Sequence, residues 1–184
     1  MTEPDRDANL LGALALVITD RTSDAIVAAA GQSVSAAAAL SALHHFLDRP
    51  TIDRLRLVLG LTPSGAVRLV DRLEAAGYVT RATGDDKRYR EVALTRKGQR
   101  AAAKVGAVRG AVLNGALAQL SSEERTTLHA LMGKLMDSFV RGNLDRGPGV
   151  AGWICRLCDT TACGREDGHC PTANSAAAYL RGPA

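Results

Sequence analysis

The spacing of apolar residues changes along this chain from every third or fourth residue, as in a helix, to every second residue, as in a strand. The change falls within one short stretch, and few folds place two short helices directly before two strands. Residues 51–59 and 62–77 carry apolar side chains at helical spacing, and Gly60 lies between them at the position of a tight turn. Residues 78–81 and 91–95 alternate as strands do, with a glycine and two aspartates between them. The sequence therefore predicts two short helices joined by a turn, followed by a β-hairpin with a charged tip.

Longer helices are expected on both sides of this unit. Apolar residues recur at helical spacing in residues 8–30 and 34–47, and again after residue 95. A last helix is expected to begin at the capping box formed by Ser121 and Glu124. The fold class is therefore mainly α with a small β-hairpin wing, in the order of a winged helix-turn-helix.

The net charge of +4 is unevenly distributed along the chain. Residues 51–100 hold 11 of the 23 Lys and Arg but 6 of the 19 Asp and Glu, a local charge of +5, which leaves −1 for the rest. Such a basic block is expected of a nucleic-acid-binding face, and otherwise of a solvated charged surface. Because the chain has only six aromatic residues, too few to stack single-stranded bases, double-stranded DNA is the expected partner.

The helix over residues 62–77 is the expected recognition helix, since the second helix of such a motif exposes side chains to base edges in the major groove. Ser64, Arg68 and Arg72 lie on one side of it. Arg68 is the best candidate base reader because an arginine can bond bidentately to guanine, and its alternative role is a solvated surface residue. The other side is expected to pack inward through Ala66, Val67, Leu69, Val70 and Leu73.

Four motifs of the chain resemble those of the MarR family of transcription regulators. They are Leu-Gly-Leu-Thr at 59–62, the segment 67–79, Asp86-x-Arg88, and Leu94-Thr95-x-x-Gly98. With the helix order, the resemblance extends over roughly residues 8–141. It implies an obligate homodimer that binds a pseudo-palindromic operator and represses until a small-molecule effector reaches the crevice between the dimerisation and DNA-binding parts.

The resemblance also implies roles for individual residues. Arg68 matches the base-contacting arginine of the recognition helix, and Arg88 matches the wing arginine that enters the minor groove. Asp86 is then expected to orient the wing, with Lys87 and Arg90 as flanking phosphate contacts. The complete expected DNA-binding set is Thr62, Ser64, Arg68, Arg72, Arg81, Lys87, Arg88 and Arg90.

Two positions leave alternatives open. Arg56 stands where the first helix of the motif usually carries a small residue, so its stem is expected to lie outward or to disturb helix packing. His44 and His45 end the second helix, a position that borders the effector crevice in MarR-like dimers. They are expected either to bind a ligand or metal, or to leave one imidazole packed and the other solvated.

All four cysteines fall near the C-terminal end, at Cys155, Cys158, Cys163 and Cys170. A cytoplasmic protein seldom forms structural disulfides, so this clustering favours one tetrathiolate metal centre. Zinc is the first candidate. The single Cys-x2-Cys pair and the closing Cys170-Pro171 also suit an iron–sulfur cluster, and metal-free redox thiols are the third candidate. His169 is a candidate to replace one thiolate.

The cysteine segment is expected to need a metal to fold. Trp153 is its only large aromatic residue, so the segment buries too little apolar surface by itself. Metal–thiolate bonds supply an apparent ~10–16 kcal/mol for structural zinc in small peptides. We therefore expect a bound metal to order residues 153–171.

The expected organisation places one domain before a cysteine-rich tail. Residues 1–141 form the domain, with a DNA-binding core at 51–95 and dimerisation helices at 8–30 and 96–141. A linker at 142–152 leads to a metal-binding tail at 153–184.

Other classes of protein are disfavoured. No catalytic Ser-His-Asp order, phosphate-cradling glycine loop or paired carboxylates stand out, so an enzyme is not expected. The alternative function is a redox-active iron–sulfur or thiol protein in which the tail cysteines carry the chemistry. The longest apolar run, residues 10–18, is too short for a membrane span and follows an acidic start, unlike a signal peptide. The expected location is the cytoplasm.

Overall fold

The computed structural model describes residues 5–83, 90–145 and 154–182. Its elements in chain order are α1 (Arg6–Ala30), α2 (Val34–His45), α3 (Ile52–Leu59), α4 (Pro63–Ala75), β1 (Val79–Thr83), β2 (Arg90–Leu94), α5 (Arg96–Leu117), α6 (Ser122–Leu144) and α7 (Pro171–Arg181). The two strands pair antiparallel, with Val79 opposite Leu94. The predicted fold class, mainly α with a small β-hairpin, is confirmed.

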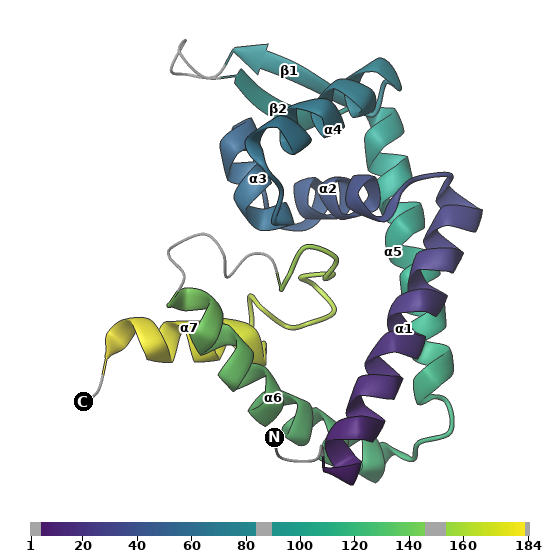
Figure 1. The fold of residues 1–184 in the computed structure, drawn as a ribbon, viewed down its shortest axis with the longest axis vertical. Helices are drawn as coiled ribbons and strands as arrows, with labels where there is room; N and C mark the ends of the chain where they lie inside the picture. Colours follow the sequence, from purple (N-terminus) through teal and green to yellow (C-terminus); the bar gives the residue numbers. More distant parts are fainter. Residues whose placement is uncertain (1–4, 84–89, 146–153, 183–184) are drawn as a thin grey trace.

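The elements form three groups in space (Figure 1). Helices α1 and α5 lie side by side along one flank. Helices α2, α3 and α4 gather with the hairpin at one end, and we call residues 34–83 and 90–95 the winged unit. Helix α6 leaves the flank and packs mainly against α7. The cysteine-bearing segment 154–170 lies between α6 and the winged unit.

Helix α2 passes through the middle of the winged unit because its alanines let neighbouring elements approach closely on several sides. Ala37, Ala39 and Leu40 are all completely buried. The largest buried side chains packed with this helix in the core of the unit are Leu55, Val58, Leu69, Val70, Val79 and Val92. Full burial of one Leu or Val side chain stabilises a fold by roughly 1.5–3 kcal/mol, so this cluster holds the recognition helix and the wing in fixed positions.

The turn between α3 and α4 is built from short polar residues and one glycine. Thr51 caps α3, whereas Asp53 accepts a hydrogen bond from Arg56 Nε at 2.8 Å. Gly60 ends the helix in the left-handed region, at φ 64°, where glycine carries no Cβ penalty. The stem of Arg56 therefore lies along the surface, and Leu55 beside it remains completely buried.

The wing is fastened to the start of α3 as well as to α4. Val92 N donates to Pro50 O at 2.9 Å, and Thr51 forms an isolated bridge with Glu91. The Glu91 carboxylate also pairs with Arg49 Nε at 2.9 Å. These contacts fix the base of the hairpin, and its tip, residues 84–89, lies outside the described residues.

The C-terminal elements differ from the expected linker and tail. The capping box predicted at Ser121 is confirmed, but α6 continues to Leu144, into the segment expected to be a linker. Helix α7 was not predicted, although Pro171 stands at its first turn and a run of alanines follows. Tyr179 donates a hydrogen bond to Asp145 and ties α7 to the end of α6. Trp153 and the rest of residues 146–153 lie outside the described residues.

In the described part of the chain, no single helix has the length and composition needed to cross a membrane. The pair α1 and α2, bent by 81° at their junction, meets that requirement together by length and composition only.

Candidate functional site

Helix α4 is held with one face inward and the other in solvent. Thr62 caps it by accepting a hydrogen bond from Gly65 N at 3.1 Å, and Pro63 occupies the first helical position. Its buried residues recur at the spacing of one helix face, as Ala66, Leu69, Val70 and Leu73. Val67, which was also predicted to pack inward, is 44% exposed because it lies one position beyond this stripe.

The outer face of α4 carries the polar residues expected to meet DNA. Ser64, Arg68 and Arg72 are exposed and follow one another at four-residue spacing, which places them in one row along the helix. Val67 is exposed beside this row. The face thus presents two guanidinium groups, a hydroxyl and a small apolar side chain, which are the groups that bond to bases, phosphates and thymine methyls.

Arg81 occupies a different place from the other predicted contacts. Its guanidinium pairs with Asp71 at 2.6 Å and with Glu74 at 3.2 Å, and its backbone N donates to Glu74 Oε1 at 3.1 Å. These contacts join β1 to α4, so Arg81 positions the wing against the recognition helix. Arg90, at the start of β2, is exposed. The predicted wing residues Asp86, Lys87 and Arg88 lie outside the described residues.

The structure brings all four cysteines to one cavity of about 220 Å³. Cys155 and Cys170 are buried, and Cys158 and Cys163 are half-buried. The Cys163 thiol donates a hydrogen bond to the carbonyl oxygen of Thr160 at 3.4 Å. Helix α6 closes another side of the cavity with His129, Met132, Gly133 and Met136.

The environment of this cavity favours negative charge on sulfur. A hydrogen bond from the Cys155 thiol, together with the positive charges of Arg109, Arg156 and Arg165, lowers the pKa of Cys158 to about 6 against the opposing effect of burial. The same hydrogen bond and burial raise the pKa of Cys155. One thiolate therefore forms readily near neutral pH, in the chemical state that binds thiophilic metals.

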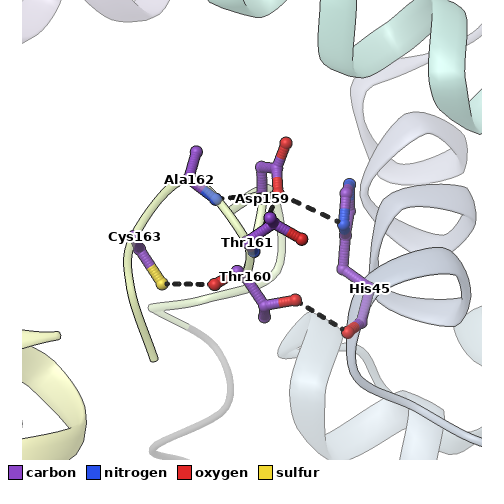
Figure 2. Close-up of polar contacts among 6 residues, drawn as sticks. All are labelled: His45, Asp159, Thr160, Thr161, Ala162 and Cys163. Atoms are coloured by element: carbon purple, nitrogen blue, oxygen red, sulfur yellow. Dashed lines mark hydrogen bonds and ion pairs between the residues drawn. The ribbon is translucent and has the colours of Figure 1, made fainter. Parts of the chain in front are cut away.

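The cysteine segment contacts the winged unit at the end of α2 (Figure 2). Thr160 Oγ1 donates to the carbonyl oxygen of His45 at 3.0 Å, and Asp159 Oδ1 lies 3.8 Å from His45 Nδ1. Burial lowers the pKa of His45, with Asp159 opposing this effect, so the imidazole is mostly neutral near pH 7. His44 is exposed. The His45 imidazole is thus packed against the cysteine segment, and the His44 imidazole is in solvent.

The histidines near the thiols are placed differently from expectation. His169 is exposed and is absent from the cavity lining, whereas His129 lines the cavity from α6. His129 was not among the predicted site residues because helical periodicity does not specify which element a helix face packs against. Within residues 5–83, 90–145 and 154–182, no three His, Cys, Asp or Glu side chains converge closely enough to hold a single metal ion.

Comparison with known proteins identifies the fold. The MarR family profile matches residues 30–88. A MarR family protein from Bacillus stearothermophilus superposes with a TM-score of 0.64 at 25% identity, over 71% of this chain and 91% of that one. The fold is that of MarR regulators. A search of curated proteins found no match.

Two further MarR-fold structures were solved with ligands. A variant of Staphylococcus aureus MepR bound to an oligodeoxyribonucleotide has a TM-score of 0.55 at 18% identity, over 74% of this chain and 99% of that one. CouR from Rhodococcus jostii RHA1, bound to p-coumaroyl-CoA, has a TM-score of 0.58 at 21% identity, over 73% of this chain and 95% of that one. The four cysteines of the present chain lie beyond the residues that the family profile matches.

Proposed function

We propose that this protein is a sequence-specific DNA-binding transcription regulator, acting in the cytoplasm as a homodimeric repressor that responds to a small-molecule or redox signal. The observation that carries the proposal is the exposed row Ser64, Arg68 and Arg72 on a recognition helix whose opposite face is locked into the core. Such a helix enters the major groove while the wing beside it reaches the neighbouring groove. MepR, with the same fold, was solved on an oligodeoxyribonucleotide.

A selection experiment tests this proposal directly. The full-length protein is incubated with a pool of random duplexes, and bound DNA is recovered and sequenced through repeated rounds. We expect a two-fold symmetric site whose half-sites are centred about one helical turn, ~34 Å, apart, because both recognition helices of a dimer must meet the same face of the duplex. Recovered DNA that binds no more tightly than the starting pool would contradict the proposal.

Dimer formation is supported by apolar surface that the chain leaves exposed on α1 and α6. On α1, Leu10, Leu14 and Leu16 are exposed, although apolar residues follow a helical spacing there. On α6, Leu135 is 47% and Phe139 62% exposed, and Val140 is the buried residue of that helix. Exposed apolar side chains repeated along a helix mark an interface, and a second copy of the chain would cover them.

Replacing Phe139 with aspartate is expected to weaken the dimer at least tenfold, or ~1.4 kcal/mol, because a charge would enter an apolar interface. Sedimentation velocity over a range of micromolar concentrations measures the change. Leu180→Asp is the control for the added surface charge, since Leu180 is 75% exposed near the end of α7. Wild-type protein that sediments as a monomer throughout this range would remove the dimer from the proposal.

A ligand can approach the protein between α5, α6 and the cysteine segment. A cavity of about 610 Å³ lies there, and its lining includes His45, Arg109, Leu113, Met132 and Leu157. CouR, with the same fold, was solved with p-coumaroyl-CoA, which supports a small-molecule response in the present chain. The alternative is a redox-active iron–sulfur or thiol protein in which the tail cysteines carry the chemistry. It is less favoured because it does not explain the exposed row Ser64, Arg68 and Arg72 on α4.

A further inference from the structure

We propose that Cys155, Cys158, Cys163 and Cys170 hold one iron–sulfur cluster, and that loading of this cluster changes DNA affinity through the contact with His45. The second part rests on the proposed DNA-binding function, whereas the first part does not. The inference joins two features of the structure: four thiols around one cavity, and a direct bridge from that cavity to the winged unit.

The arrangement of the thiols suits a cluster better than a single zinc ion. Zinc draws four sulfur atoms around one point, at ~2.3 Å from the metal. Here the four thiols line a cavity of about 220 Å³, and across the described residues no three potential ligands converge on one ion. A cluster fills such a space because its several irons each take a thiolate.

The surroundings of the cavity match the needs of a cluster. Cys155 and Cys158 are the chain's only Cys-x2-Cys pair, a spacing that is found in cysteine runs that bind iron–sulfur clusters. Met132, Met136 and Pro171 provide apolar side chains in the cavity lining. Arg165 lines the same cavity, and Arg109 lines the neighbouring cavity together with Cys158 and Cys163, so their positive charge balances an anionic tetrathiolate centre.

Three contacts connect the cavity to the rest of the fold. The Thr160 hydroxyl donates to the carbonyl oxygen at the C-terminal end of α2, and Leu157 packs against both buried clusters of the core. On the other side, Pro171 lies against Gly133 of α6, the helix proposed to form the dimer. A cluster that fixes the conformation of the cysteine segment therefore also favours one orientation of the winged unit relative to α6. The two recognition helices of a dimer bind one operator only when they are a fixed distance apart. DNA affinity therefore depends on the orientation of each winged unit relative to α6.

The first test is composition of the full-length protein purified without oxygen. We expect a brown protein that contains iron and acid-labile sulfide in stoichiometric amounts, and loss of both in Cys158→Ser and Cys163→Ser. His169→Ala is the matched control, since this exposed histidine is outside the cavity lining, and it should keep full iron content. A colourless protein with one zinc per chain would overturn the cluster, and four titratable thiols without metal would overturn any metal centre.

The second test uses wild-type protein, so it does not depend on whether a cysteine variant folds. DNA affinity is measured by fluorescence anisotropy on the selected duplex before and after removal of iron by a chelator, and again after reconstitution with iron and sulfide. We expect a reversible change of about 5-fold or more, within the usual range of coupling between two sites. Equal affinity in the loaded and unloaded forms would overturn the coupling.

Thr160→Ala isolates the route of this coupling. It removes the hydrogen bond to His45 without altering a thiol, so the variant should keep its iron while the change in affinity on loading becomes smaller. Thr160→Ser keeps the hydroxyl and should restore the wild-type difference. An unchanged difference in Thr160→Ala would overturn the route through His45. If neither form binds DNA, the proposed function fails while the composition still decides the cluster.

Discussion

Replacing Gly98 with alanine is expected to destabilise the protein by about 3 kcal/mol, at the upper end of the usual cost of overpacking a core. Gly98 is buried in the first turn of α5, where the backbone passes the start of β1. A Cβ atom at this position would lie 2.0 Å from the carbonyl oxygen of Tyr78 and 3.0 Å from a methyl group of Leu94. The first neighbour is backbone, so α5 and the hairpin would have to separate.

Thermal unfolding followed by circular dichroism measures this effect. For a chain of this size the loss corresponds to roughly 6–12 °C in Tm. Gly106→Ala is the matched control, because Gly106 also lies within α5 but an added Cβ would have open space around it. Alanine there should stabilise the helix by ~0.5–1 kcal/mol. If Gly98→Ala melts at the wild-type temperature, the close approach of α5 to Tyr78 is wrong.

Replacing Arg68 with alanine is expected to cost ~1–3 kcal/mol, a 5- to 150-fold loss of affinity, on the selected duplex. Arg68 is exposed in the middle of the outer row of α4, while its neighbours Leu69 and Val70 are buried. The side chain can therefore be removed without disturbing the core. Fluorescence anisotropy on the selected and on random duplexes should show a much larger loss on the selected one, together with relaxed preference at one base pair.

Arg181→Ala provides the control for the change of net charge. Arg181 is exposed at the end of α7, far along the chain from the winged unit, and its removal should leave both affinities nearly unchanged. Equal losses of Arg68→Ala on selected and random DNA would show that Arg68 contacts phosphate and does not read a base.

Lys87→Ala is expected to behave differently from Arg68→Ala. Lys87 belongs to the wing tip, outside the described residues, and was predicted to contact phosphate. Loss of a phosphate contact weakens binding to all duplexes alike and lowers the slope of log affinity against log salt by about one. A salt titration that gives the wild-type slope for this variant would remove Lys87 from the phosphate contacts.

Much of the winged unit was predictable because its signals are local. Thr62 and Pro63 start a helix through their own geometry, and Gly60 permits the left-handed turn before it. The strands were recognisable from alternation over a few residues. The end of α6 and the existence of α7 were harder to predict from the sequence. Gly142 and the glycine- and proline-rich residues after it predict a linker where α6 in fact continues to Leu144, and the alanine run of α7 is too short to predict a helix by itself.

The candidate functional residues also fall into those that local sequence predicts and those that it does not. Exposure of Ser64, Arg68 and Arg72 followed from the helical period, since burying one face leaves the other in solvent. The engagement of Arg81 by Asp71 and Glu74 did not follow, because those carboxylates belong to another element and meet Arg81 only when β1 packs on α4. Val67 was misplaced for a related reason, since periodicity does not fix how wide a buried stripe is.

The sequence by itself determined the order of elements, the caps, the turn at Gly60 and the grouping of four cysteines in one segment, since each depends on neighbours within a few residues. Only the tertiary structure decided why Gly98 must lack a side chain, which residues of α6 face the thiols, and that Thr160 reaches His45. Those contacts join residues far apart in the chain. Their geometry depends on how whole helices pack, which no local pattern of residues specifies.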